Sequence, residues 1–161
     1  MKKYTFTLQS NSMGGVISEK EAHTASGGKN ISPQLEWINA PAETKCFAIT
    51  MYDKDAPTTS GFWHWIVVNI PKTVTELSEN AGNPDTHLMP AGAIQCKTDY
   101  GTIGYGGPHP PIGHGWHMYT LTVYALNAPI ELDENTPAAQ IGFQLWAKTI
   151  EKASIVAYYQ R

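Results

Sequence analysis

Three apolar segments of strand length, not separated by helical patterns, most constrain how this chain can fold. They run from Cys46 to Tyr52, from Phe62 to Ile70 and from Trp116 to Leu126. Tyr4 to Gln9 alternates apolar and polar residues, and Ser154 to Tyr159 also has strand character. Because strands that do not alternate with helices usually pair as antiparallel neighbours, the expected fold is mostly β with antiparallel sheets.

One substantial helix is expected in the C-terminal half of the chain. Thr136 suits the N-cap position and Pro137 suits the first helical position. The segment Ala138 to Lys152 follows, with Ile141 and Leu145 four residues apart on one face. We therefore predict a helix over Ala138 to Lys152.

Size and composition indicate one globular domain, which we assign to residues 1–161. The 161 residues are 42% apolar and 16% charged, enough to bury one core. The net charge is −3 and Arg161 is the single arginine, so no nucleic-acid partner is expected. The sequence contains no run of about 20 apolar residues, so no membrane-spanning helix is predicted. Cys46 and Cys96 fit a reducing cytoplasm, although one disulfide bridge stays open as an alternative.

Polar residues fall at the ends of the apolar strand faces. Because alternate side chains of a strand point to the same side, Asp53 and Asp55 would continue the face formed by Phe47 to Met51. By the same alternation, His64 would lie on the face of Ile66. His117 and Tyr119 likewise begin the apolar face of the third long segment. Burying such groups without partners would cost about 1–3 kcal/mol each. We therefore expect them to meet in one small polar pocket with apolar walls.

Each of these residues also has an ordinary structural interpretation. Asp53 to Pro57 has the composition of a polar turn. His64, between two tryptophans, is equally typical of a hydrogen-bonded core histidine, and His117 and Tyr119 of packing residues on a strand. The prediction of a pocket therefore depends on finding polar residues at the ends of several strands together, and not on any one residue.

The segment Gly101 to Gly115 contains six Gly and three Pro, which predicts a long loop. Loops of this length often carry function. His87 and His114 have no evident partner and are interpreted as surface residues. A metal site of mixed His and carboxylate ligands remains an alternative use of the polar cluster. Its ligands would be Asp53, Asp55, His64 and His117.

Four stretches, in order, resemble the phosphatidylethanolamine-binding proteins, which include the Raf kinase inhibitor proteins and their small bacterial and archaeal relatives. Each stretch matches a short family pattern, and the four lie between Asn30 and Tyr119; with the terminal strands and the late helix, nearly the whole chain fits the family. They are Asn30 to Trp37, Asp53 to Pro57, Trp63 to Pro71, and Tyr105 to Tyr119.

The resemblance implies a large antiparallel sheet packed on a smaller one, with peripheral helices and a small anion pocket near the end of the sheet. The Ala56–Pro57 bond is cis in this expectation. The residues that match the family's pocket are Asp53, Asp55, His64, Gly107, His109 through its backbone N–H, Pro111, His117 and Tyr119.

Two positions depart from the family pattern. Lys54 stands where the family has a proline, and Met118 stands where it has an arginine. A bound phosphate would therefore be held by His64, His117, the Tyr119 hydroxyl and backbone N–H groups. We expect Asp53 or Asp55 to orient one histidine. With a histidine pKa near its usual value of about 6.5, anion binding should tighten below neutral pH.

The resulting functional hypothesis is a non-catalytic, cytoplasmic, kinase-inhibitor-like protein that binds a small anion such as phosphate or a phosphorylated headgroup. It needs no catalytic residue, cofactor or metal. One alternative is a metal-assisted or acid/base phosphoester hydrolase that uses the same cluster. Another is a protein-interaction module, regulating a kinase or another protein partner, in which the pocket is vestigial. Small members of the family are sometimes dimers, so the resemblance also implies a homodimer as an expectation for this protein.

Overall fold

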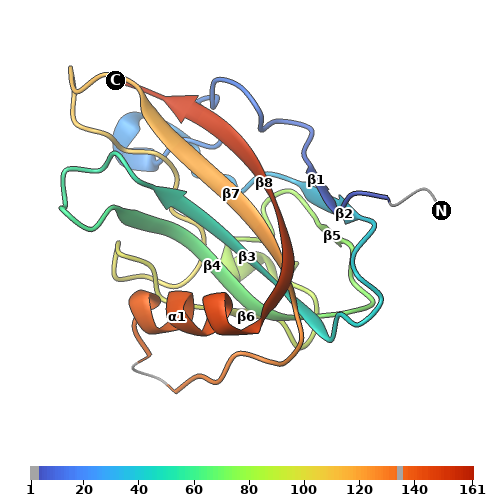
Figure 1. The fold of residues 1–161 in the computed structure, drawn as a ribbon. Coiled ribbons are helices and arrows are strands. Elements are labelled where there is room, and N and C mark those ends of the chain that lie inside the picture. The colour runs from blue at the N-terminus through green and yellow to red at the C-terminus, as the bar shows by residue number, and fades with distance from the viewer. Residues whose placement is uncertain (1–3, 134–135) are drawn as a thin grey trace.

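The computed structural model describes residues 4–133 and 136–161, which form two antiparallel sheets and one α-helix (Figure 1). The larger sheet contains, from edge to edge, β6 (Ile94–Gln95), β4 (Phe62–Pro71), β3 (Cys46–Asp53), β7 (His117–Leu126) and β8 (Thr149–Tyr159). The smaller sheet contains β1 (Thr7–Gln9), β2 (Leu35–Ile38) and β5 (Glu76–Leu77). The helix is α1 (Ala138–Lys148), and two short 3-10 helices span Thr24–Ser26 and Pro84–Thr86. The mostly β fold, with a large antiparallel sheet and a smaller one, is confirmed.

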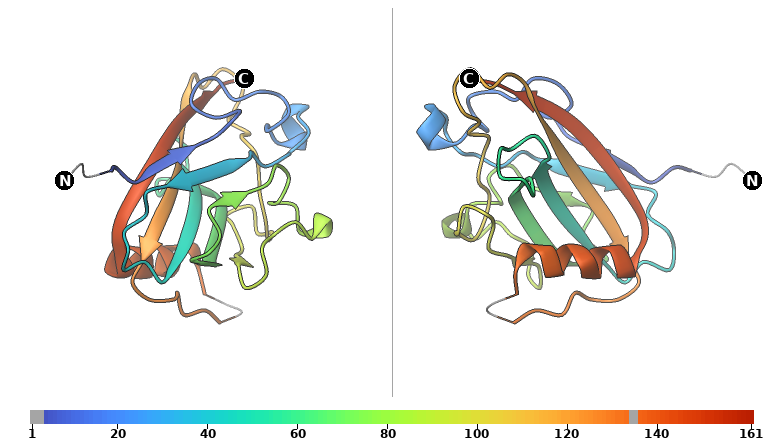
Figure 2. Two further views of the ribbon diagram at one scale, coloured as in Figure 1. Left: turned by 90° about the vertical axis from the view of Figure 1, so that its right-hand side faces the viewer. Right: turned by 60° about the vertical axis from the view of Figure 1, so that its left-hand side comes forward.

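The larger sheet is covered on both faces, which explains the apolar runs in the sequence. The strands of the smaller sheet lie across one face of the larger sheet (Figure 2). Phe47 and Ile49 face the smaller sheet, where Trp37 packs edge-on against Phe47 with ring centroids 5.4 Å apart. On the opposite face, Ile66 packs against Leu145 of α1. Because both faces of β3 and β4 are buried, these strands are nearly continuous in apolar residues instead of alternating.

The helix is shorter than the predicted segment Ala138 to Lys152. It ends at Lys148, and Thr149 already pairs with β7 as the first residue of β8. The long β7–β8 ladder therefore overrides the local helical pattern. The predicted N-cap is also wrong, because Pro137 occupies that position and Thr136 does not cap the helix. No helix in the described part of the chain is long and apolar enough to cross a bilayer.

Two covalent features are settled by the structure. Cys46 and Cys96 are both free thiols, so the bridge that the sequence left open is not formed. The expected cis peptide bond between Ala56 and Pro57 is wrong, because this bond is trans.

Candidate functional site

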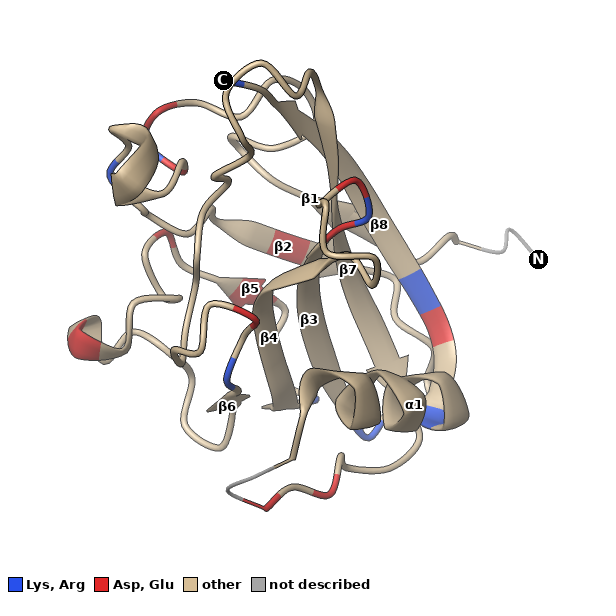
Figure 3. Ribbon diagram, turned by 90° about the vertical axis from the view of Figure 1, so that its left-hand side faces the viewer, with Lys and Arg blue, Asp and Glu red and all other residues tan. Residues whose placement is uncertain are grey.

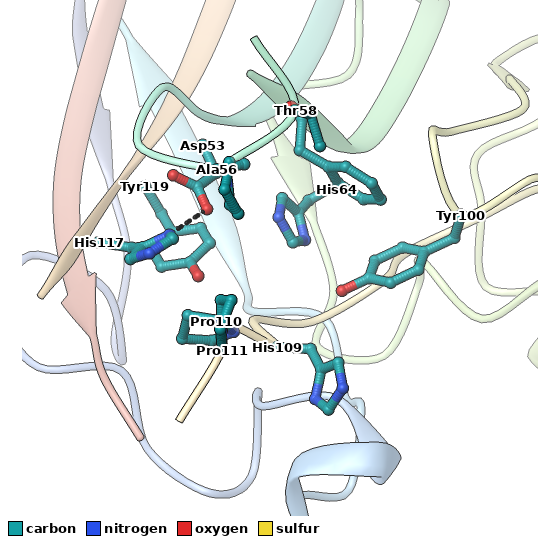
Figure 4. Close-up of a pocket in the computed structure, with 12 residues that line it drawn as sticks. Asp53, Ala56, Thr58, His64, Tyr100, His109, Pro110, Pro111, His117 and Tyr119 are labelled. Atoms are coloured by element: carbon teal, nitrogen blue, oxygen red, sulfur yellow. Dashed lines mark hydrogen bonds and ion pairs between the residues drawn. The ribbon is translucent and has the colours of Figure 1, made fainter. Parts of the chain in front are cut away.

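A pocket of about 240 Å³ opens at one end of the larger sheet (Figure 4). Its floor comes from the end of β3, the start of β4 and the start of β7, which are neighbours in the sheet. Two loops, the one that joins β3 to β4 and the long Gly/Pro loop, supply its walls. The lining residues are Asp53, Ala56, Pro57, Thr58, Phe62, His64, Tyr100, His109, Pro110, Pro111, His117 and Tyr119.

A β-bulge turns His64 into this pocket. On β3, Met51 and Tyr52 are adjacent, but they pair with Trp65 and Trp63 of β4, which leaves His64 as the extra residue. His64 therefore lies on the same side of the sheet as Trp65, while Ile66 faces α1. The predicted shared face of His64 and Ile66 is wrong, although the predicted meeting of His64 with Asp53 and Tyr119 is found.

A chain of hydrogen bonds runs from Asp53 to the surface. The Oδ2 atom of Asp53 lies 2.7 Å from Nδ1 of His117, and both side chains are almost fully buried. The Oδ1 atom of Asp53 accepts from the backbone N–H of Asp55 at 2.8 Å. Nε2 of His117 lies 2.7 Å from Nδ1 of His114, an exposed residue. His114 was predicted to lack a partner, but its Nδ1 forms a hydrogen bond with the second ring nitrogen of the buried His117.

His64 is held as a neutral imidazole. Its Nδ1 lies 2.8 Å from the carbonyl oxygen of Gly106, which can only accept, so Nδ1 carries the proton. Burial lowers the pKa of His64 to about 4. The expectation of an ordinary histidine pKa therefore does not hold for this residue. Its Nε2 is the ring nitrogen that does not contact Gly106, and because the residue lines the pocket this atom is available to a ligand.

Tyr119 contributes an unpaired hydroxyl to the floor of the pocket. Its side chain is fully buried, and its hydroxyl has no hydrogen-bond partner among the described residues. Burial, with a further contribution from the negative charge of Asp53, raises the pKa of Tyr119 far above its usual value. The group is therefore a neutral O–H donor. In Figure 4 this hydroxyl points toward the space between His64 and Pro110.

Six of the eight predicted site residues line the pocket, and two do not. The two exceptions are Asp55 and Gly107. The Asp55 carboxylate accepts from the backbone N–H of Met118 at 2.9 Å and from Lys54 at 2.6 Å. The contact with Lys54, followed by that with Met118, lowers the pKa of Asp55. Asp55 thus ties the β3–β4 loop to β7, and Asp53 is the carboxylate that orients a histidine.

Gly107 supports the pocket from behind. Its N–H donates to Oδ1 of Asn30 at 2.7 Å, and its carbonyl accepts from the hydroxyl of Tyr100, which lines the pocket. Asn30 also donates to the carbonyl of Tyr105, so its side chain bridges two points of the Gly/Pro loop. Arg161 ties down the same loop by donating to the carbonyl of Pro110 at 2.7 Å.

We expect Gly107→Ala to destabilise the protein by about 1–3 kcal/mol. An added Cβ would collide with the carbonyl oxygen of Glu21 and lie 2.6 Å from the backbone nitrogen of His23, neither of which can rotate away. Chemical denaturation would measure the change. Gly15→Ala is the control, because its Cβ would meet nothing within 4 Å. Equal stabilities of the two variants would contradict the close packing of the Gly/Pro loop on the Glu21 segment.

Sequence reasoning missed six of the twelve lining residues and two residues that support them. The missed lining residues are Ala56, Pro57, Thr58, Phe62, Tyr100 and Pro110, and the supporting residues are Asn30 and His114. Asn30 lay at the start of a matched stretch, and His114 lay three residues before His117, so a local signal existed for both. Tyr100 carried none, because only the folded loop brings it to within 5.4 Å of the His64 ring, measured between centroids.

Charged groups are scarce at the pocket. Lysine and arginine are scattered over the molecule instead of forming one patch (Figure 3), and no lysine or arginine is among the described residues that line the pocket. Among the described residues there is also no group of three or more His, Cys, Asp or Glu side chains placed to hold a metal ion.

Comparison with known proteins identifies relatives along nearly the whole chain. The family model described as phosphatidylethanolamine-binding protein matches residues 7–160. The protein YbcL of Escherichia coli is 43% identical over 160 residues, which cover 96% of this chain and 87% of YbcL. YbhB of the same organism is 44% identical over 133 residues, covering 82% of this chain and 83% of YbhB.

Solved structures agree with the sequence relatives. The crystal structure of E. coli YbcL, described as a new member of the mammalian PEBP family, superposes with a TM-score of 0.93 at 42% identity, covering 98% of this chain and 99% of the other. A Chlamydia trachomatis homologue gives a TM-score of 0.80 at 27% identity, covering 98% of both chains. This chain therefore belongs to the phosphatidylethanolamine-binding protein family.

Proposed function

We propose that this protein binds a small oxyanion, such as the phosphate of a phosphorylated headgroup, and does not transform it. The observation that carries the proposal is the buried hydroxyl of Tyr119, a hydrogen-bond donor without a partner at the floor of the pocket. An unpaired buried donor costs about 1–3 kcal/mol, and an incoming oxygen atom would satisfy it. The family name points to the same class of ligand.

Binding without turnover is favoured because the polar groups are already engaged. Both oxygens of Asp53 accept hydrogen bonds, and both ring nitrogens of His117 have partners. The free Nε2 of His64 is a weak base, since the pKa of that imidazole is lowered to about 4. A general base or nucleophile would need to be freed from one of these contacts before it could act.

Tyr119→Phe tests the proposal by calorimetric titration with inorganic phosphate. Loss of one hydrogen bond to a charged ligand should weaken binding by about 10- to 100-fold. The same substitution should leave the unliganded protein as stable or more stable, because it removes a buried hydroxyl that has no partner. Weaker binding together with unchanged or higher stability is the signature of a ligand-binding donor.

Tyr124→Phe is the matched control. Tyr124 lies on the same strand, β7, but its hydroxyl contacts Thr50 at 3.3 Å and is not part of the pocket. This variant should bind phosphate as the wild type does. If phosphate failed to bind wild-type protein, or if Tyr119→Phe bound it equally well, the proposal would be wrong. Release of phosphate from a phosphoester by the wild type would favour the hydrolase alternative.

A further inference from the structure

Tyr119 and His64, both among the described residues that line the pocket, offer a hydrogen-bond donor and a hydrogen-bond acceptor to a ligand. The donor is the hydroxyl of Tyr119, and the acceptor is Nε2 of His64. The two rings are close neighbours, with centroids 5.2 Å apart and planes at 77° (Figure 4). A ligand group that satisfies both must offer an oxygen that accepts and a hydrogen that donates.

The acceptor character of His64 is fixed by the backbone. The carbonyl of Gly106 accepts from Nδ1 of His64 at 2.8 Å, and the N–H of Gly106 donates to the carbonyl of His64 at 2.9 Å. These two contacts hold the ring in one orientation and one tautomer, so Nε2 bears the lone pair. Because the ring is buried, adding a second proton at Nε2 is unfavourable, and the pKa of His64 is accordingly lowered to about 4.

The groups around His64 do not reverse this preference. The backbone of Gly106 and Gly107 and the carboxylate of Asp53 favour a protonated ring. His23, whose ring stacks on Tyr100, disfavours it, and burial outweighs all of these contributions. Tyr100 and Tyr119 face the ring as neutral phenols whose pKa values burial raises. His109, which also lines the pocket, has its pKa lowered, chiefly by burial. His117, the other lining histidine, lies between Asp53 and His114, which contact its two ring nitrogens.

The electrostatics of the pocket also oppose a ligand with a second negative charge. No lysine or arginine is among the described lining residues, and the carboxylate of Asp53 already lies at the floor. The neighbouring guanidinium of Arg161 donates to the carbonyl of Pro110 and does not itself line the pocket. Ala56, Pro57 and Phe62 make much of the wall apolar, which strengthens repulsion between like charges.

We propose that the pocket selects the protonated, monoanionic form of an oxyacid, above all of a phosphate monoester, over oxyanions that carry no proton. The inference rests on the proposed function and narrows it. A phosphoryl oxygen of the ligand accepts from the hydroxyl of Tyr119, and its P–OH donates to Nε2 of His64. The ester substituent then lies against the apolar wall.

Methyl phosphate and methyl sulfate provide a matched pair of probes. At pH 5.5 both carry mainly one negative charge, because the second pKa of a phosphate monoester is about 6. They have similar shapes, but only methyl phosphate has a hydroxyl to donate. We expect wild-type protein to bind methyl phosphate about 10- to 100-fold more tightly than methyl sulfate, measured by calorimetry. Between pH 5.5 and 8 the affinity for methyl phosphate should fall roughly 10-fold or more as the monoanion disappears.

His64→Asn provides the control for the acceptor. The Asn amide can replace Nδ1 as donor to Gly106 but does not extend to the position of Nε2. This variant should bind the two probes with similar, weak affinity, and its methyl phosphate affinity should no longer depend on the P–OH group.

The outcomes separate this inference from the proposed function. Equal binding of both probes by wild-type protein would overturn the selectivity and leave anion binding intact. Tight methyl sulfate binding with uptake of a proton would show that His64 becomes a donor, which also overturns the inference. Binding of neither probe would overturn both the inference and the proposed function.

Discussion

Asp53→Ala should destabilise the protein by about 3–5 kcal/mol, because it removes one partner of a buried pair. The carboxylate accepts from Nδ1 of His117 at 2.7 Å and from the backbone N–H of Asp55 at 2.8 Å. With alanine in its place, both donors stay buried without an acceptor. Denaturant-induced unfolding, followed by tryptophan fluorescence, would measure the loss.

Asp55→Ala is the matched control for this prediction. Asp55 is the same residue type two positions along the chain, but its side chain is 32% exposed and its charged partner, Lys54, is 55% exposed. Loss of the contacts to Lys54 and to the N–H of Met118 should therefore cost only about 1 kcal/mol. If the two variants were equally stable, the Asp53–His117 pair would not be the buried anchor that its geometry indicates.

The long strands and their antiparallel arrangement were predictable from the sequence because burial on both faces leaves a direct mark on it. Cys46 to Asp53 and Phe62 to Pro71 are nearly continuous in apolar residues, as strands of a covered central sheet must be. The end of the helix was not predictable in this way. Residues Thr149 to Lys152, which were predicted to continue the helix, belong to β8 because β7 is there to pair with them.

Of the five polar residues predicted to meet, all but Asp55 line the pocket, but the reason given for this meeting is partly wrong. Strict alternation along β4 puts His64 on the face of Ile66, which packs against α1, away from Asp53. The bulge opposite Met51 and Tyr52 reverses the direction of this one side chain. A bulge depends on the pairing of two strands, so the residue order of one strand does not reveal it.

The protonation state of His64 depends on the burial of its ring and so could not be predicted from the residue type. An unburied histidine at position 64 would titrate near pH 6.5, which is the value that the sequence analysis assumed. In the folded protein, desolvation makes the neutral ring the stable form at neutral pH. The proposed anion binding therefore relies on a neutral acceptor and the donor of Tyr119, instead of on a His64 imidazolium.

The same burial makes His64 a source of acid sensitivity. The unfolded chain takes up a proton at His64 as the pH falls through about 6.5, whereas the folded protein does so only near 4. Over this window the unfolded state binds more protons, so the free energy of unfolding falls as the pH falls. The shift corresponds to about 3 kcal/mol, fully present above pH 6.5 and fully lost below pH 4.

His64→Asn isolates this contribution, because asparagine keeps a donor for Gly106 and does not titrate. We expect unfolding free energies measured from pH 7.5 to 4 to fall more steeply for wild-type protein than for the variant, by about 3 kcal/mol over the range. His23 and His109, whose pKa values burial also lowers, contribute to both proteins and cancel in the difference. Parallel curves for the two proteins would mean that His64 is solvated in solution, and the neutral acceptor would then be lost from the pocket along with its preference for a protonated ligand.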